Sequence, residues 1–407
     1  GGMGPTSPLD GTYGCTRPRH RASLSPSLGD AHFGNHTPSK RKGLVNLHLS
    51  GLGTAVPPGV LEQSDAAELS PAFCAADARQ ARVLRRLYGR SGVETRNTVV
   101  LRADQGVLEE RVPFYPVANG PDDRGPTTGE RMAWYEAEAP PLAELAARRA
   151  LKDASTPVEA ITHLVTVSCT GFFSPGIDAV LIDALGLQRT VHRTHVGFMG
   201  CHGALNGLRV AASQAREAEA RVLLCAVELC SLHFAYGWNS EMVVANTLFA
   251  DGAAAVVGTP AQNGETPGWC VQAQGTFLMP MSADAMSWRI GDHGFRMTLS
   301  AEVPMLIRTN LGGWLESWLQ DQGLRMEDVG SWAVHPGGPR ILGAVQDALA
   351  LENGHLDVSR EVLRSHGNMS SPTVLFILER LRKAGAALPC VALAFGPGLV
   401  VEAMLVA

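Results

Sequence analysis

Three residues of the chain are of types that carry out acyl-transfer chemistry, and each stands where an expected strand ends or an expected helix begins. Cys201 follows an apolar segment and opens an alanine-rich one, within Gly-Cys-His-Gly-Ala. A cysteine at a helix N-terminus feels partial positive charge, which favours its thiolate. His335 precedes a Pro-Gly-Gly-Pro loop, and Asn368 lies just ahead of an apolar helical segment. Taken singly, each also fits an ordinary core cysteine, loop histidine or turn asparagine.

Together the three residues could form a nucleophilic centre. The His335 imidazole could hold the Cys201 thiolate as an ion pair, so that the sulfur takes an acyl group from a thioester. His335 and Asn368 could both donate hydrogen bonds to one thioester carbonyl oxygen, which stabilises the enolate formed when a malonyl group loses CO2. Because cysteine proteases use the same three residue types, the types alone leave both chemistries open.

Composition limits the class of protein. The 407 residues are 45% hydrophobic and 18% charged, which is typical of a globular protein with a large core. The net charge of -5 gives no support to nucleic-acid binding. None of the eight cysteines forms a C-x-x-C pair, so neither a disulfide scaffold nor a zinc ribbon is expected. With no long apolar run and no signal-peptide pattern, we expect no integral membrane segment and a cytoplasmic location.

The order of elements predicts an α/β fold. Apolar strands are expected at 44–57, 161–171, 191–200, 221–231 and 253–259, and they alternate with helices at 77–93, 139–155 and 201–217. The second half repeats this style, with helices at 305–323, 338–350 and 371–385, a strand leading into His335, and a closing strand pair at 390–407. Such alternation favours buried sheets covered by helices.

Three segments are expected along the chain. Residues 1–43 are rich in proline, glycine and serine and contain Lys-Arg-Lys near their end, so we expect a disordered tail. It is either a targeting segment or an extension without a specific role. Residues 44–262 would form a first half that carries the cysteine. Residues 263–407 would form a related second half that carries the histidine and the asparagine.

Five segments then resemble, in order, the signature blocks of the chalcone synthase-like family, the type III polyketide synthases. They are GFMGCHGALNGLR, LFADGAAAVVG, AVHPGGPRIL, HGNMSSPTVLFIL and AFGPGLVVEAML, and the resemblance runs from residue 44 to the end. It implies a thiolase-like fold of two pseudo-repeated halves in αβαβα layers. It also implies a homodimer with the segment 172–175 near the partner's cavity, CoA thioesters as substrates, and no metal or organic cofactor. The sequence itself adds neither a zinc motif nor a dinucleotide-binding one.

The resemblance also implies roles for single residues. Cys201 matches the acyl-carrying nucleophile, and His335 and Asn368 match the decarboxylation and oxyanion pair. Phe249 matches a gatekeeper between the CoA tunnel and the cavity. The remaining matches are basic residues that would hold CoA phosphates (Arg86 and Arg90), glycines that would let the pantetheine arm pass (Gly337 and Gly338) and a cyclisation loop (Gly396, Pro397 and Gly398). The two arginines could equally form a solvated helix face.

The chain departs from the plant pattern at positions that would line the cavity. Met297 stands where a second gatekeeper phenylalanine is usual, and Trp288 replaces a small glycine. Cys230 and His233 stand where plant enzymes have threonine, Cys169 lies on the adjoining strand, and Ser370 is kept. This set resembles bacterial members that extend fatty acyl starters to alkylpyrones or alkylresorcinols, although plain core packing also explains these side chains. Two alternatives stay open: a ketoacyl synthase III-type initiator of fatty acid synthesis and an inactive thiolase-fold scaffold.

Overall fold

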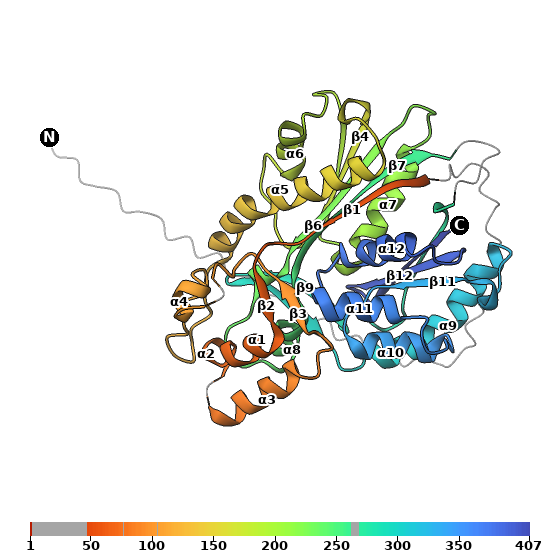
Figure 1. Cartoon of the computed structure of the whole chain (residues 1–407). Helices are drawn as coiled ribbons and strands as arrows, with labels where there is room; N and C mark the ends of the chain where they lie inside the picture. The colour runs from red at the N-terminus through yellow and green to blue at the C-terminus, as the bar shows by residue number, and fades with distance from the viewer. Residues whose placement is uncertain (2–46, 76, 104, 262–267) are drawn as a thin grey trace. The chain divides into compact units, whose positions relative to one another are not determined.

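The computed structural model describes residues 1, 47–75, 77–103, 105–261 and 268–407. The chain divides into the units Gly1–Lys42 and Gly43–Ala407, and the architecture below is that of the second (Figure 1). The predicted tail at 1–43 and the boundary at 262/263 fall in or beside segments outside the described residues. No helix in the described part is long and apolar enough to cross a membrane.

A nine-stranded sheet runs through the unit in the order β11-β12-β13-β8-β1-β7-β6-β4-β5. Its strands are β11 (Ser331–Val334), β12 (Cys390–Gly396), β13 (Val400–Val406), β8 (Cys270–Leu278), β1 (Leu47–Ala55), β7 (Asp251–Pro260), β6 (Val222–Leu229), β4 (His163–Ser168) and β5 (His192–Gly197). The first four belong to the second half of the chain and the last five to the first half. They join where Leu47 and His48 of β1 pair with Val271 and Cys270 of β8.

The helices are α1 (Gln63–Leu69), α2 (Pro71–Cys74), α3 (Ala78–Tyr88), α4 (Leu108–Arg111), α5 (Thr128–Asp153), α6 (Ile177–Leu185), α7 (Gly203–Gln214), α8 (Ser240–Leu248), α9 (Val303–Asp321), α10 (Pro339–Ala348), α11 (Asp357–His366) and α12 (Thr373–Lys383). Short 3₁₀ helices span η1 (Val158–Ala160), η2 (Gly200–His202), η3 (Cys230–His233) and η4 (Met326–Asp328). Two small sheets pair β2 (Val60–Glu62) with β3 (Thr95–Asn97), and β9 (Met286–Gly291) with β10 (Gly294–Leu299).

Alternation along the strands produces the predicted five layers. In β6, Leu223 and Cys225 face a core shared with α5 and α6, whereas Leu224 faces a core shared with α7 and α12. In β12, Ala392 faces the same α7 and α12 core, whereas Leu393 faces α9 and α10. Helices α7 and α12 therefore form the middle layer, between the strands of the two halves (Figure 1).

Helix α5 begins well before the expected residue 139. A capping box starts the helix: Thr127 Oγ1 accepts from the Glu130 N–H, and the Glu130 carboxylate accepts from the Thr127 N–H at 2.7 Å. Pro140 and Pro141 lie in the interior of this helix, which is held by its packing on the sheet.

Small residues let α5 approach β1 closely. A Cβ atom added at Gly53 would lie 2.3 Å from the Ala150 nitrogen and 2.5 Å from the Ala146 oxygen, which are both backbone atoms of α5. Because backbone cannot rotate away, any side chain at this position must push the helix off the sheet.

Gly53→Ala is therefore expected to lower the free energy of unfolding by about 1–3 kcal/mol or more, measured by denaturant titration. Gly343→Ala is the matched control, because its added Cβ would meet nothing within 4 Å. Since that substitution lies inside α10, it should be neutral or stabilise by up to about 1 kcal/mol. Equal midpoints for the two variants would contradict the close-contact argument.

Candidate active site

Cys201 lies at a sharp turn from β5 into α7. Phe198 and Gly200 both take left-handed backbone conformations, with φ of 60° and 75°. Glycine is required at position 200 twice over, because a Cβ there would also lie 2.6 Å from the Pro397 ring. The turn presents Cys201 within the 3₁₀ segment that opens α7, and the sulfur reaches the wall of a large cavity.

Asn368 is held by backbone hydrogen bonds to the end of α8. Its N–H donates to the Leu248 oxygen at 2.8 Å, and its carbonyl accepts from the Ala250 N–H at 2.9 Å. Its side-chain oxygen accepts from the Ser370 N–H at 2.8 Å, which fixes the amide. Ser370 and Cys201 both line the cavity, and the Ser370 hydroxyl hydrogen-bonds to the Cys169 sulfur at 3.5 Å.

His335 follows directly on β11, where its N–H donates to the Leu393 oxygen at 2.8 Å. Its side chain is 1% exposed, and neither ring nitrogen has a hydrogen-bond partner among the described residues. Burial, together with a smaller effect of the nearby His202, lowers the pKa of His335 to about 3. The ring is therefore neutral at physiological pH, with one nitrogen that donates and one that accepts.

The free thiol of Cys201 is also neutral at physiological pH. Its pKa is raised to about 11, mainly by burial, while the Ser370 side chain lowers it, the Glu228 carboxylate raises it and the Asn368 side chain lowers it by smaller amounts. The helix N-terminus was expected to favour the thiolate, but loss of solvation outweighs this effect in the free chain. The Cys201–His335 ion pair stays a prediction.

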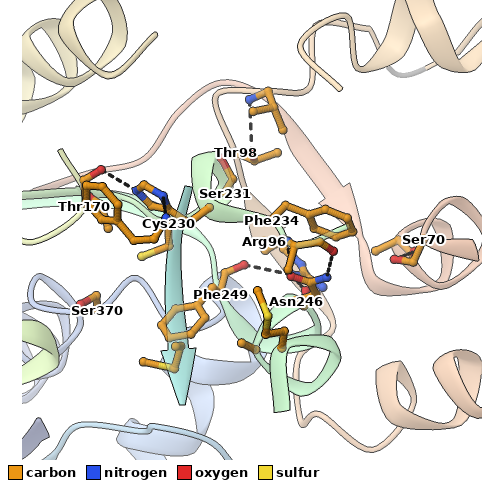
Figure 2. Close-up of a pocket in the computed structure, with 18 of the residues that line it drawn as sticks. Ser70, Arg96, Thr98, Thr170, Cys230, Ser231, Phe234, Asn246, Phe249 and Ser370 are labelled. Atoms are coloured by element: carbon orange, nitrogen blue, oxygen red, sulfur yellow. Dashed lines mark hydrogen bonds between the residues drawn. The ribbon is translucent and has the colours of Figure 1, made fainter. Parts of the chain in front are cut away.

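The cavity beside Cys201 encloses about 1220 Å³ of empty space including its mouth, and most of its lining is apolar. The structure brings most of the predicted cavity residues to its wall: Cys169, Cys230, His233, Phe249, Trp288, Met297, Ser370 and Pro397. Figure 2 shows Phe249 between Ser370 on one side and Arg96 and Asn246 on the other.

One side of the cavity is built by the β9–β10 hairpin, a segment to which the sequence pattern assigned no strands. Trp288 and Met297 are directly paired across it. The Trp288 indole N–H donates to the Cys169 oxygen at 2.8 Å and its ring meets His233 edge-on at 5.3 Å. His233 is fixed as well: it accepts from the Phe295 N–H at 3.0 Å and bonds the Thr170 oxygen at 2.6 Å.

Other predicted residues lie off the cavity wall. Arg86 and Arg90 are exposed, at the end of α3 and just after it. Gly338 has a φ of 144° and caps α10, close to Leu248, while Gly337 precedes it. Gly396 lies against the His202 ring, and Gly398 has a φ of 135°. The roles of these residues in CoA binding and cyclisation stay predictions.

Two buried charged residues were missed by the sequence analysis. Glu228 lies behind the site and accepts hydrogen bonds from the Cys169 N–H, the Thr170 hydroxyl and the Ser371 hydroxyl, at 2.6–3.1 Å. Its sequence signal is a lone carboxylate inside the apolar run of β6. Arg96 of β3 lies in the cavity wall and carries no comparable signal. No cluster suited to a metal ion occurs among the described side chains.

Comparisons with known proteins agree along nearly the whole chain. The family descriptions "Chalcone and stilbene synthases, N-terminal domain" and "C-terminal domain" match residues 37–260 and 270–407. The chain is 36% identical over 363 residues to a 1,3,6,8-tetrahydroxynaphthalene synthase of Streptomyces peucetius subsp. caesius, covering 88% of this chain and 92% of that protein. It is 32% identical to "Alpha-pyrone synthesis polyketide synthase-like Pks18" of Mycobacterium tuberculosis, covering 88% and 90%.

Solved structures show the same similarity. The crystal structure of PKS-I from the brown alga Ectocarpus siliculosus superposes with a TM-score of 0.82 at 33% identity, covering 90% of this chain and 99% of that one. The C-terminal type III polyketide synthase domain of Steely1 from Dictyostelium superposes with a TM-score of 0.80 at 29% identity, covering 89% and 99%.

The neutral state of Cys201 is testable by alkylation with iodoacetamide and peptide mass spectrometry. Because only the thiolate reacts and the pKa is about 11, the rate should rise about tenfold per pH unit through the neutral range. Ser370→Ala removes a hydroxyl group that lowers this pKa, so it should slow labelling. Ser213→Ala, at an exposed serine, is the control. A rate independent of pH from about pH 6 to 9 would show that the thiolate already exists.

Proposed function

Since the chain belongs to the chalcone and stilbene synthase family and is a type III polyketide synthase, we propose that Cys201, His335 and Asn368 carry out its condensation reaction. One observation carries this assignment: Cys201 and Ser370 both line the cavity, the Asn368 side-chain oxygen accepts a hydrogen bond from the Ser370 N–H, and both nitrogens of the buried His335 ring lack a partner among the described residues. Buried polar atoms without partners are rare, and here a substrate carbonyl would supply the missing bond.

In the loading step, Cys201 attacks the carbonyl of an acyl-CoA starter while His335 accepts its proton. The bond from sulfur to the acyl carbon forms, the bond to the CoA sulfur breaks, and the CoA thiolate leaves and is protonated. The two neutral groups thus become charged only as the reaction proceeds, which suits a site that water cannot stabilise.

In the extension step, malonyl-CoA loses CO2 and the electron pair of the broken carbon–carbon bond forms an enolate. The His335 N–H and the Asn368 amide donate to the enolate oxygen. The enolate carbon attacks the Cys201 thioester, Cys201 is expelled, and the product is a CoA thioester two carbons longer. It reloads on Cys201 for further cycles and then cyclises. No step transfers electrons to an external acceptor, so we propose no metal and no organic cofactor.

For the starter and product we propose an aliphatic acyl chain and ring closure to a pyrone or resorcinol. The support is the apolar lining of the cavity together with the flexible Met297 at the predicted gate. Phe249 would be the first gate, and Arg86, Arg90, Gly337 and Gly338 would bind CoA outside it. The comparisons favour this function over a ketoacyl synthase III-type initiator or an inactive scaffold.

We further propose a homodimer in the cytoplasm. Support for the dimer comes from the 42% exposed Phe172, whose ring contacts Phe198 and stacks on Phe295 of the cavity wall. Strand β5, beside it, forms the open edge of the sheet. A second copy covering this face would bury Phe172 next to its partner's cavity.

The test is incubation with 14C-malonyl-CoA and acyl-CoA starters from acetyl to stearoyl. Organic-soluble pyrones or resorcinols are expected, and Cys201→Ala should abolish them because no other nucleophile carries the chain. Cys225→Ala, at a core cysteine off the cavity, should keep activity. Untouched malonyl-CoA, or a single condensation that requires acyl carrier protein, would contradict the proposal.

Trp288→Ala should shift the product range. Removing the indole enlarges the cavity beside Cys169, so we expect acceptance of longer starters or more extensions, read by mass spectrometry of the extracted products. Trp314→Ala, in the distant core formed with α9, should leave the range unchanged. An identical product profile in the Trp288 variant would show that this side chain does not limit the growing chain.

A further inference from the structure

Arg96 is a buried, positively charged residue in the wall of the cavity. Among the described residues, no carboxylate is hydrogen-bonded to it. The residue is 5% exposed and lies on β3, with its guanidinium 5.5 Å from the centre of the Tyr88 ring. All five of its N–H donors are used. Nε and Nη2 donate to the Gln63 side-chain oxygen at 3.2 and 2.5 Å, and the other three donate to backbone carbonyls. The guanidinium has no N–H left to donate to a substrate. Its role must therefore lie in the protein groups to which it is hydrogen-bonded.

Those carbonyls form the end of α8. Nη1 donates to the Asn246 and Phe249 oxygens, both at 2.9 Å, and Nη2 donates to the Thr247 oxygen at 3.3 Å (Figure 2). The last carbonyls of a helix have no partner within the helix and carry partial negative charge. A planar guanidinium can satisfy several of them at once, and its charge complements the helix end.

The same helix end fixes two residues of the proposed site. Phe249 ends α8 and places its ring in the cavity wall. Asn368 is bonded through its backbone to the carbonyl of Leu248 and to the N–H of Ala250, on either side of Phe249. A shift of the last turn of α8 would therefore move the gate and the Asn368 amide together.

We infer that Arg96 is a positioning residue of the condensation reaction, which holds the end of α8 so that Asn368 keeps its place next to Ser370 and Phe249 keeps its place in the cavity wall. The inference rests on the proposed function. Lysine would keep the charge but would lack the fork that joins three carbonyls and Gln63. Arg96→Lys therefore removes the set of hydrogen bonds made by the guanidinium and keeps the positive charge.

The test separates two partial reactions in Arg96→Lys and in the unmodified chain. Decarboxylation of malonyl-CoA, measured as released 14CO2, needs the Asn368 amide and should fall about 10- to 100-fold in kcat. Acylation of Cys201 by a starter acyl-CoA, measured by intact-protein mass, depends on Cys201 and His335 and should change less than about 3-fold. A general loss of folded protein would instead lower both rates in proportion.

Two further variants keep the inference falsifiable. Arg382→Lys is the control, because Arg382 also donates to a backbone carbonyl, that of Leu49, but lies away from the cavity. Gln63→Met removes the acceptor shared by Nε and Nη2 and should lower decarboxylation in the same direction, by about 3- to 10-fold. If Arg96→Lys does not fold, the ratio of decarboxylation to acylation in Gln63→Met tests the inference by itself.

An unchanged ratio of the two partial rates in these variants overturns the inference while the proposed function stands. If the unmodified chain itself fails to consume malonyl-CoA, the proposed function has failed instead. The two failures are therefore distinguishable within one set of assays.

Discussion

The structure depends on one packing constraint, the middle layer in which α7 and α12 lie between the strands of the two halves. Both helices are enclosed by apolar side chains from two directions, so neither can shift without opening the core. Cys201 precedes α7, and Asn368 and Ser370 precede α12. The middle layer therefore brings Cys201 and Ser370, which are far apart in the sequence, to the wall of one cavity.

The same burial decides the electrostatics of the site. Cys201 and His335 are both neutral in the free chain, because solvent is excluded from thiol and imidazole alike. Glu228 lies behind them, its pKa raised by burial, and is held by hydroxyl and amide donors, with no counter-ion among the described residues.

The sequence analysis identified residues marked by their neighbours in the chain, and it missed residues whose partners are brought to them only by the fold. Cys201, His335 and Asn368 each lie beside a recognisable boundary between elements, and the five layers that the family resemblance implied are confirmed by the structure. The expected start of α5 was wrong, because the helix begins at a capping box formed by Thr127 and Glu130. Arg96 could not be found, because its partners on α8 are joined to it only by the fold.

The β9–β10 hairpin has a consequence for how this protein can diverge. It forms a two-stranded sheet of its own, hydrogen-bonded apart from the nine strands that carry the core, and yet it presents Trp288 and Met297 to the cavity. Side chains that shape the reaction space are thus mounted on an element whose backbone the main sheet does not share. A substitution at Trp288 or Met297 can therefore reshape the cavity wall without changing any strand pairing of the nine-stranded sheet.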